Sequence, residues 1–408
     1  MRVILSTFGP LHLIKSAEYL SKMVDIQVLQ GWIPSWWNKW FLAIASKIVG
    51  RDLFKAFRRR TPAILKGKNH SLGLAEFYLW GCKLFKLQSP MVSSYNAARI
   101  YGYQSRTLIH DADIFHVRSG SGFSGAIERA KSKGMKVVVD HSIAHPAFMD
   151  KQLREEYRRQ GELFNLGLDN PFWAGIIEDC KIADVVLVNS QFVKDTFTET
   201  GFDADRIKVC LLGVREDFNA IKRRYEIEDG TLKILFTGGF GFRKGAAYIL
   251  RALSELDKEG FKYAFTCVGD SSGAIKLIES IGTRHVNRVN TIPQDELKQY
   301  LSEYDVYLFP SLCEGCASSG MEAMSAGIPV IATKESGLPI EDGIDGIIIE
   351  SKNVDAIKDA LKRIASDTEL RSRIGWNASQ KIRENYTWDK YAENVTKIYR
   401  DLLKQPNL

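Results

Sequence analysis

The sequence lacks the features that mark several classes of protein. Its six cysteines are scattered over 408 residues, which excludes a disulfide-built scaffold and suits a reducing compartment. Cys313 and Cys316 form a C-x-x-C pair, but no second pair completes the ligand set of a structural zinc ion. No window holds about 18 uninterrupted apolar residues, so we expect no transmembrane helix. The N-terminal apolar run stops at Gly9-Pro10 without a cleavage site, which indicates a first strand rather than a signal peptide.

The composition is that of a globular protein with an excess of positive charge. A chain of 408 residues is too long for one ordinary hydrophobic core, so two domains are expected. Hydrophobic residues make up 45% and charged residues 26%, which is typical of soluble domains. The net charge of +7 favours an anionic partner, and nucleotide diphosphates, membrane lipids and nucleic acid all fit that description.

Short runs of Val, Ile and Phe alternate with longer amphipathic stretches along the chain. Because the short runs do not alternate apolar with polar residues, they are typical of strands buried on both faces. The expected strands are Arg2–Ser6, Ile26–Leu29, Ile114–Val117, Lys136–Asp140, Val185–Asn189, Ile207–Leu211, Lys233–Thr237, Tyr263–Val268, Val306–Phe309, Val330–Ala332 and Gly346–Ile349. The expected helices between them include Ala246–Glu259, Asp295–Glu303, Gly320–Ala326 and Val354–Ser366. This order predicts an α/β fold with two doubly wound parallel sheets.

The domain boundary is expected near residues 214–232, which are charged and carry no core pattern. We therefore predict one Rossmann-like domain over residues 1–215, a second over 216–385, and a closing helix over 386–408. The closing helix repeats apolar residues at helical spacing, namely Trp388, Tyr391, Val395, Ile398, Tyr399 and Leu402. Two doubly wound domains that face each other leave a cleft, and ligands bind there at the carboxyl ends of the strands.

A glycine-rich turn with two cations follows the expected strand Lys233–Thr237. It reads Gly-Gly-Phe-Gly-Phe-Arg-Lys-Gly over residues 238–245, and a helix is expected directly after it. Glycines let the backbone approach a bulky anion, and Arg243 and Lys244 add two full charges to the partial positive charge of the helix N-terminus. We expect a diphosphate site; the alternative is a tight turn with exposed basic residues. The dinucleotide fingerprint G-x-G-x-x-G is absent, since Lys244 stands where its third glycine would be.

Two glutamates frame a second candidate site. Glu314 lies on the loop after the strand Val306–Phe309, and Glu322 is expected in the first turn of the next helix. Between them, Ala-Ser-Ser-Gly over residues 317–320 presents small residues and free N–H groups to the same cleft. Carboxylates accept hydrogen bonds from sugar hydroxyls, and small residues let a phosphate approach. Taken singly, Glu314 also fits a solvated loop position, and Glu322 fits an acid that the helix dipole favours.

These motifs together resemble one enzyme family. Seven residues separate the two glutamates, and the second opens Glu-Ala-Met-Ser-Ala-Gly-Ile-Pro-Val-Ile, which resembles the signature of the retaining glycosyltransferases of family four. The Arg-Lys-Gly turn is similar to that family's phosphate-binding turn, the segment 305–311 to its strand before the first glutamate, and Tyr386-Thr-Trp-Asp to its lead into the last helix. The resemblance covers most of the chain and is most specific over residues 232–350. It implies the GT-B fold, in which two Rossmann-like domains face each other across a cleft.

The resemblance also implies roles for residues of the second domain, which would bind the nucleotide-sugar donor. Arg243 and Lys244 would bind the diphosphate and stabilise it as it leaves, Glu314 would contact the donor sugar, and Glu322 would hold the ribose hydroxyls. The remaining donor-binding positions are Gly239, Pro293, Ala317, Ser318 and Ser319. Many relatives carry an arginine at the position of Gly239, so Arg243 would take over that charge here.

The first domain would bind the acceptor, and the same resemblance selects three of its residues. Gly9, after the first strand, would approach the donor phosphate and the acceptor. His141 and His145 follow the strand Lys136–Asp140, and the surrounding segment matches best with His145 in the catalytic position and His141 as the alternative. For both histidines, a surface-loop position without a task is the other interpretation.

No metal or other cofactor is expected. Besides the C-x-x-C pair, the candidate for metal binding is the D-x-D of Asp111 and Asp113, which directly precedes the strand Ile114–Val117 and is interpreted as a strand entry. The donor is expected to be a nucleoside diphosphate sugar whose charge the cationic turn neutralises in place of a metal ion.

Residues 32–68 combine aromatic residues at helical spacing with a basic run. Lys47 to Lys68 holds eight basic residues against one acid, Asp52. Such a segment lies in a membrane interface and attracts anionic lipid, or it packs on the first sheet with a solvated basic face. Nucleic acid is not expected, because no recognition module accompanies the patch.

The sequence therefore predicts a cytoplasmic, hexosyltransferase-type enzyme, peripheral on the inner face of the membrane if residues 32–68 bind it. It would move a sugar from a UDP- or GDP-sugar to a carbohydrate or lipid-linked acceptor with retention, in polysaccharide, glycolipid or other glycoconjugate biosynthesis. Two rivals stay open: a nucleotide-sugar epimerase or oxidoreductase on a related fold, and a non-catalytic binder of membranes or polyanions.

Overall fold

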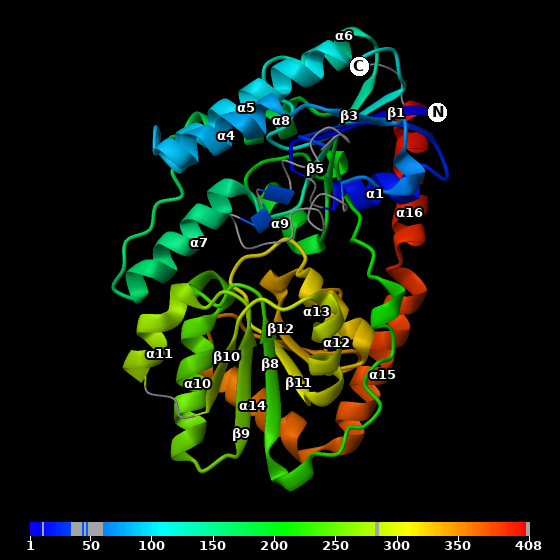
Figure 1. The fold of residues 1–408 in the computed structure, drawn as a ribbon. Helices are drawn as coiled ribbons and strands as arrows, with labels where there is room; N and C mark the ends of the chain where they lie inside the picture. Colours follow the sequence, from blue (N-terminus) through cyan, green and yellow to red (C-terminus); the bar gives the residue numbers. More distant parts are fainter. Residues whose placement is uncertain (10–11, 34–42, 45, 48–59, 282–284, 405–408) are drawn as a thin grey trace.

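The computed structural model describes residues 1–9, 12–33, 43–44, 46–47, 60–281 and 285–404. These residues form two lobes, and each lobe is built on one parallel sheet flanked by helices (Figure 1). The first and last described segments both lie in the same lobe, because the C-terminal helices run back from the second lobe to the first (Figure 1). None of the helices in this described part is long and apolar enough to span a bilayer.

Both sheets have the strand order of a doubly wound fold. The first sheet has the order β3-β2-β1-β4-β5-β6-β7, with β1 Arg2–Thr7, β2 Asp25–Gln30, β3 Asn69–Ser71, β4 Ile114–Arg118, β5 Lys136–His141, β6 Val185–Val188 and β7 Ile207–Val209. The second has the order β10-β9-β8-β11-β12-β13, with β8 Leu232–Thr237, β9 Tyr263–Val268, β10 Val286–Val289, β11 Val306–Phe309, β12 Val330–Thr333 and β13 Ile347–Ile349. Every pairing of neighbouring strands is parallel, which confirms the expected α/β class.

Helices connect the strands and cover both faces of each sheet. In the first lobe they are α1 Leu13–Leu20, α4 Leu74–Phe85, α5 Pro90–Thr107, α6 Ala126–Ser132, α7 Pro146–Arg159, α8 Pro171–Ile182 and α9 Gln191–Glu199. In the second they are α10 Ala246–Lys258, α11 Ile275–Ile281, α12 Gln294–Glu303, α13 Ser318–Ala326, α14 Val354–Ser366 and α15 Thr368–Asn385. The last helix, α16 Trp388–Lys404, packs on the first lobe. Burial on both faces explains the continuous apolar strands: on β1, Val3 and Leu5 pack with α1 and α16, whereas Ile4 packs with α5.

All the expected strands form, and two further strands complete the sheets. β3 reads Asn-His-Ser and β10 reads Val-Asn-Arg-Val, and neither has a fully buried residue. Both strands lie at the outer edge of their sheet, where a polar sequence costs little because one side faces solvent. Their composition therefore gave no signal for a buried strand.

The segment 214–232 links the lobes, but it does carry core residues. Phe218 is fully buried in the core of the second lobe, and Val214 forms an isolated bridge with Thr387 at the start of α16. The expectation of a segment without core pattern was wrong because one aromatic residue among charges does not produce a periodic signal. Helix α16 then returns to the first lobe, where it packs on α1 and where the hydroxyl of Tyr399 pairs with Nδ1 of His116 at 2.5 Å.

Helix α7 also joins the two lobes, between which it lies in Figure 1. The hydroxyl of Tyr248, on α10, donates a hydrogen bond to Oε2 of Glu156 at 2.7 Å. Nζ of Lys352 donates to Oε1 of Gln152 at 3.0 Å, so a second contact forms about one turn nearer the start of the helix. The carboxyl end of the first sheet is thereby held against the carboxyl end of the second.

Candidate active site

Two cations and one carboxylate meet where the strand order of the second sheet reverses. In that sheet β8 has β9 on one side and β11 on the other, so the chain leaves β8 and β11 in opposite directions and their loops open a crevice. Arg243 and Lys244 lie on the turn after β8, and Glu314 lies on the loop after β11. Nη1 of Arg243 is 2.6 Å and Nζ of Lys244 is 3.3 Å from Oε1 of Glu314. The structure therefore brings together three of the four residues predicted to be catalytic.

The backbone of the turn explains how the cations reach this position. Gly238 has φ +119°, and a Cβ built on it would lie 2.9 Å from Nζ of Lys244. Its missing side chain thus makes room for the ammonium group, which also lies over the ring of Phe309. Nη1 of Arg243 donates to the carbonyl of Cys313 at 2.8 Å, which fixes the guanidinium beside the β11 loop. Gly239 is exposed, and a Cβ there would meet only the Asp270 carbonyl, 4.0 Å away.

Glu322 lies on the same side of the lobe, next to the loop of Pro293, another predicted donor-binding position. It is the fifth residue of α13, so the expectation that it lies in the first helical turn was wrong. The helix begins at Ser318, two residues before the expected start. Nε2 of Gln294 donates to Oε1 of Glu322 at 3.2 Å, and Gln294 follows the exposed Pro293 at the start of α12. Nη1 of Arg215 donates to Oε1 of Gln294 at 2.7 Å, which orients the amide.

The small residues between the glutamates form the N-terminus of α13. Ala317 precedes the helix and is buried, while Ser318 and Ser319 open it with N–H groups that have no partner within the helix. The hydroxyl of Tyr307, on β11, donates to Oγ of Ser319 at 2.8 Å and lies 2.9 Å from Oγ1 of Thr237, on β8. These hydrogen bonds fix the helix start against the end of β8. All the donor-side predictions except Pro293 thus lie on or next to the loops after β8 and β11, and Pro293 directly precedes α12.

Burial makes the carboxyl group of Glu322 a weaker acid than usual, and this has a measurable consequence for the stability of the fold. Burial raises the pKa of Glu322 from 4.5 to about 7, against the opposing field of Arg215. The folded protein therefore holds a proton that the unfolded chain has already released between these two pH values, and stability falls as pH rises through this window. We expect wild type to lose up to about 3 kcal/mol relative to Glu322→Gln between about pH 5 and about pH 8. Urea unfolding of both proteins across this range checks the prediction.

The control for this experiment is Glu279→Gln, which changes an exposed glutamate on α11. Its unfolding free energy should differ from that of wild type by the same small amount at every pH. A pH-independent difference between wild type and Glu322→Gln would contradict the raised pKa.

The two histidines of the first lobe are buried rather than exposed. His141 ends β5, and its Nδ1 lies 2.9 Å from Oγ of Ser119. His145 caps the N-terminus of α7, where its Nδ1 accepts from the N–H of Ala147 at 3.2 Å. Burial lowers the pKa of His141 to about 3 and that of His145 to about 4, so both are neutral at pH 7. The interpretation as surface-loop histidines was wrong, and a role for either histidine in the reaction stays a prediction.

The lobes touch directly beside the donor-side cluster. Oγ of Ser190 donates to the carbonyl of Gly315 at 2.5 Å, and a Cβ on Gly315 would lie 2.1 Å from the carbonyl oxygen of Ser142. Because Gly315 follows Glu314 and Ser142 follows His141, this contact brings His141 into the region of the donor-side loops. Among the described residues, no hydrogen bond or ion pair joins His141 or His145 to the cluster of Arg243, Lys244 and Glu314.

A buried charged network at the carboxyl end of the first sheet was not predicted. Asp140, on β5, lies 3.0 Å from Nε2 of His12 and 3.3 Å from Nη1 of Arg118. The imidazole of His116 lies 3.9 Å away. Burial alone would raise the pKa of Asp140, but His12 and the other two groups hold it well below its usual range. The carboxylate is therefore ionised, and Arg118 extends the network to Oγ of Ser142 at 2.7 Å, beside the contact between the lobes.

Other predictions fall outside this cluster. Gly9 follows β1 and lines a pocket of the first lobe that contains none of the donor-side residues. Asp113 accepts a hydrogen bond from the N–H of Arg2 at 2.7 Å, and Asp111 pairs with Lys133 at 2.6 Å, so the D-x-D makes structural contacts at the entry to β4. Within the described ranges, no group of three or more His, Cys, Asp or Glu side chains is arranged to hold a metal ion.

The predicted membrane segment lies mostly outside the described residues, which omit 34–42, 45 and 48–59. Of its described residues, Trp32 is buried, Ile44 is half exposed, and Nη1 of Arg60 lies 2.7 Å from Oε1 of Glu76. Membrane binding through residues 32–68 stays a prediction.

Comparison with known proteins finds relatives among the glycosyltransferases. Residues 217–381, which contain all the donor-side residues, match the family described as "Glycosyl transferases group 1". An uncharacterized glycosyltransferase of Methanocaldococcus jannaschii is 28% identical over 238 residues, which are 55% of this chain and 60% of that protein. The amylovoran biosynthesis glycosyltransferase AmsK of Erwinia amylovora is 28% identical over 305 residues, 68% of this chain and 70% of that protein. Alignments to three of the curated relatives span only 53% to 61% of their length.

Solved structures show the same architecture over the whole chain. The crystal structure of Anabaena HepE in complex with UDP and glucose superposes with a TM-score of 0.64 at 14% identity, covering 98% of this chain and 100% of that one. This likeness establishes the fold, which is GT-B, as expected. Over residues 217–381 the chain matches the group 1 glycosyltransferases, and this confirms the family resemblance expected from the sequence.

Proposed function

We propose that this protein transfers a sugar from a nucleoside diphosphate sugar to an acceptor hydroxyl with retention of configuration. One observation carries the proposal: Arg243 and Lys244 converge on Glu314 at the point where the strand order of the second sheet reverses. Two cations at a helix N-terminus bind a diphosphate, and a carboxylate beside them accepts hydrogen bonds from sugar hydroxyls. In the free protein Glu314 is the counter-ion of both cations, and a donor diphosphate would compete for them.

The reaction breaks the bond between the anomeric carbon and the oxygen of the diphosphate. The acceptor oxygen forms its bond to the anomeric carbon on the face that the diphosphate leaves, and its proton moves to an oxygen of the departing diphosphate. Arg243 and Lys244 stabilise the negative charge that grows on the diphosphate. Because these side chains supply the balancing positive charge, no metal ion is needed. No protein nucleophile takes part. Retention rests on the resemblance of the motifs to the retaining glycosyltransferases.

Several observations support a nucleotide sugar as the donor. Glu322 lies beside Gln294 and Pro293, so a ribose that hydrogen-bonds to its carboxylate would place the base against the α12 loop. HepE, which shares the fold, was crystallised with UDP and glucose. AmsK, by its name, acts in the biosynthesis of the polysaccharide amylovoran, and a carbohydrate or lipid-linked acceptor in glycoconjugate synthesis fits such a relative.

A thermal-shift screen followed by product analysis tests the proposal. We expect UDP or GDP, and the matching sugar nucleotide, to raise the melting temperature at saturating concentration by several degrees, because only the folded state binds them. With UDP-glucose or GDP-mannose, the nucleoside diphosphate should be released in proportion to added acceptor. The anomeric signal of the product in the NMR spectrum should show the configuration of the donor.

Three outcomes would contradict the proposal. If no nucleotide stabilises the protein, the donor site is absent and a non-catalytic binder becomes the better account. An isomerised sugar nucleotide without acceptor would indicate an epimerase. A product with the opposite anomeric configuration would overturn retention alone.

A further inference from the structure

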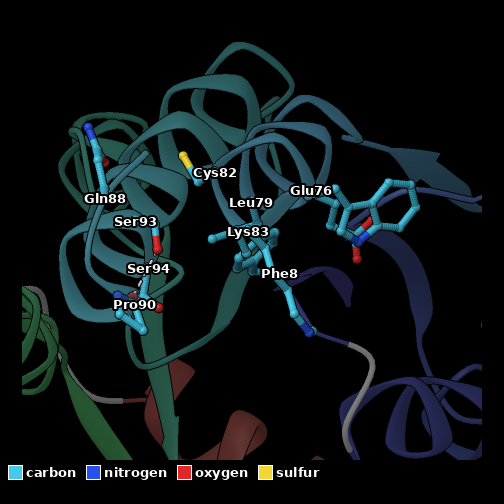
Figure 2. Close-up of a pocket in the computed structure, with 11 residues that line it drawn as sticks. Phe8, Glu76, Leu79, Cys82, Lys83, Gln88, Pro90, Ser93 and Ser94 are labelled. Carbon is cyan, nitrogen blue, oxygen red and sulfur yellow. Dashed lines mark hydrogen bonds between the residues drawn. The ribbon is translucent and has the colours of Figure 1, made fainter. Parts of the chain in front are cut away.

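The pocket that Gly9 lines has a volume of about 600 Å³ and lies in the first lobe between α4, α5 and the loop that follows β1 (Figure 2). Helix α4 contributes Leu79, Trp80 and Lys83, α5 contributes Pro90, and the loop contributes Phe8. The walls are therefore mainly apolar, although the pocket is open to solvent. A protein rarely keeps such a surface exposed unless it binds something there.

The polar groups at the pocket are nearly all engaged within the protein. Glu76 receives the N–H of Trp32 at 2.5 Å and the guanidinium of Arg60 at 2.7 Å, so its charge is already paired. Gln88 accepts from the hydroxyl of Tyr78 at 2.7 Å. The hydroxyls of Ser93 and Ser94 donate to the carbonyl of Pro90 at 3.0 and 2.7 Å.

Lys83 is different, because it lines the pocket and has no hydrogen-bond or ion-pair partner among the described residues. It offers a positive charge at the rim of an apolar space. The apolar surface continues outward along α4, where Trp80 is 44% and Leu84 is 75% exposed. A ligand that matches these features has an anionic group, an apolar body that fills the pocket, and a chain long enough to follow the helix.

The pocket also lies at the carboxyl end of the strands of the first sheet. Gly9 lines it and follows β1, which is the strand at which the order of that sheet reverses. The N–H of Phe8 donates to Oγ of Ser121, in the loop after β4, at 3.1 Å, so the two loops of the switch point are joined here. A ligand in the pocket would thus enter the region between the lobes at its anionic end.

We propose that this pocket binds a lipid phosphate and that this lipid carries the acceptor. The apolar chain packs against Leu79, Trp80 and Phe8, and the phosphate pairs with Lys83. The acceptor role rests on the proposed transferase function, whereas binding of the lipid phosphate does not.

Equilibrium binding of three probes to the full chain tests the pocket. Farnesyl phosphate should bind below its critical micelle concentration, farnesol should bind at least about tenfold more weakly, and inorganic phosphate should show no saturable binding, since one charged contact accounts for about a factor of ten. Lys83→Gln should weaken farnesyl phosphate about tenfold and leave farnesol unchanged. Ser94→Trp, which places an indole in the pocket, should weaken both lipids.

The matched control is Lys86→Gln, which removes an exposed lysine that follows α4 and does not line the pocket. It should bind all three probes as wild type does. Equal losses of affinity for farnesyl phosphate in Lys83→Gln and Lys86→Gln, measured also with phosphatidylglycerol vesicles, would show that a general basic surface binds the lipid. That result would overturn the proposal of binding in the pocket. So would farnesyl phosphate binding that Ser94→Trp leaves intact.

The acceptor role has a separate readout. In a transfer assay, farnesyl phosphate should inhibit competitively against the acceptor and not against the donor; any other pattern against the acceptor overturns this role. The thermal shift with UDP should be the same in all three variants as in wild type. If UDP gives no shift while farnesyl phosphate still binds, the proposed function fails and the lipid site stands.

Discussion

Replacing Lys244 with glutamine should lower kcat/KM for sugar transfer by about 100-fold to 1000-fold, which is the usual loss when one group that stabilises developing charge is removed. The ammonium lies 3.3 Å from Oε1 of Glu314, and its side chain is only 17% exposed. A cation in so enclosed a site acts more strongly on the departing diphosphate than it would in water. Glutamine keeps much of the length of the side chain and its hydrogen-bonding end, so the loss reports the charge.

Measuring kcat and the affinity for UDP separately distinguishes this role from simple donor binding. Because charge grows on the diphosphate as the bond breaks, kcat should fall more than the affinity for UDP. Lys258→Gln, at the exposed far end of the same α10 helix, is the control and should keep wild-type activity. An equal change in both variants, or a Lys244→Gln protein with a lowered melting temperature that explains its inactivity, would refute the assignment.

The donor-side cluster was predictable because its members come from two short motifs. Arg243 and Lys244 are adjacent in sequence, and Glu314 and Glu322 stand on either side of a single helix start. Once the parallel sheet is expected, the loops after β8 and β11 must open at the same edge, so proximity follows from topology.

The network around Asp140 was not predictable, because it depends on packing between distant segments. Asp140 meets His12 across 128 positions of the chain, and His116 meets Tyr399 across 283. Neither pair leaves a spacing in the sequence. The burial of His145 was missed for a related reason: its ring packs edge-on against Phe197 and also contacts Phe202, and α7, α8 and β6 separate both from it in the sequence.

The contact that Gly315 makes with the first lobe could not be predicted from the motif alone. The sequence places it between the predicted residues Glu314 and Ala317 and gives it no task. In the structure it is the point where the β11 loop meets the first lobe, with Oγ of Ser190 donating to its carbonyl. The side-chain space that it leaves is filled by the backbone of Ser142. The close approach of the β11 loop to the first lobe therefore depends on the absence of a side chain at position 315.

We expect Gly315→Ala to reduce kcat by about 100-fold, since a displacement on the order of 1 Å at a reacting centre has an effect of that size. The new Cβ would lie 2.1 Å from the carbonyl oxygen of Ser142, so the lobes must separate locally. UDP should still raise the melting temperature, because Lys244 and Glu322 stay on the second lobe, and small-angle X-ray scattering should show a larger radius of gyration. Gly81→Ala, on α4 with no atom near its Cβ, should change neither quantity. A fully active Gly315→Ala enzyme would mean that transfer does not need this contact between the lobes.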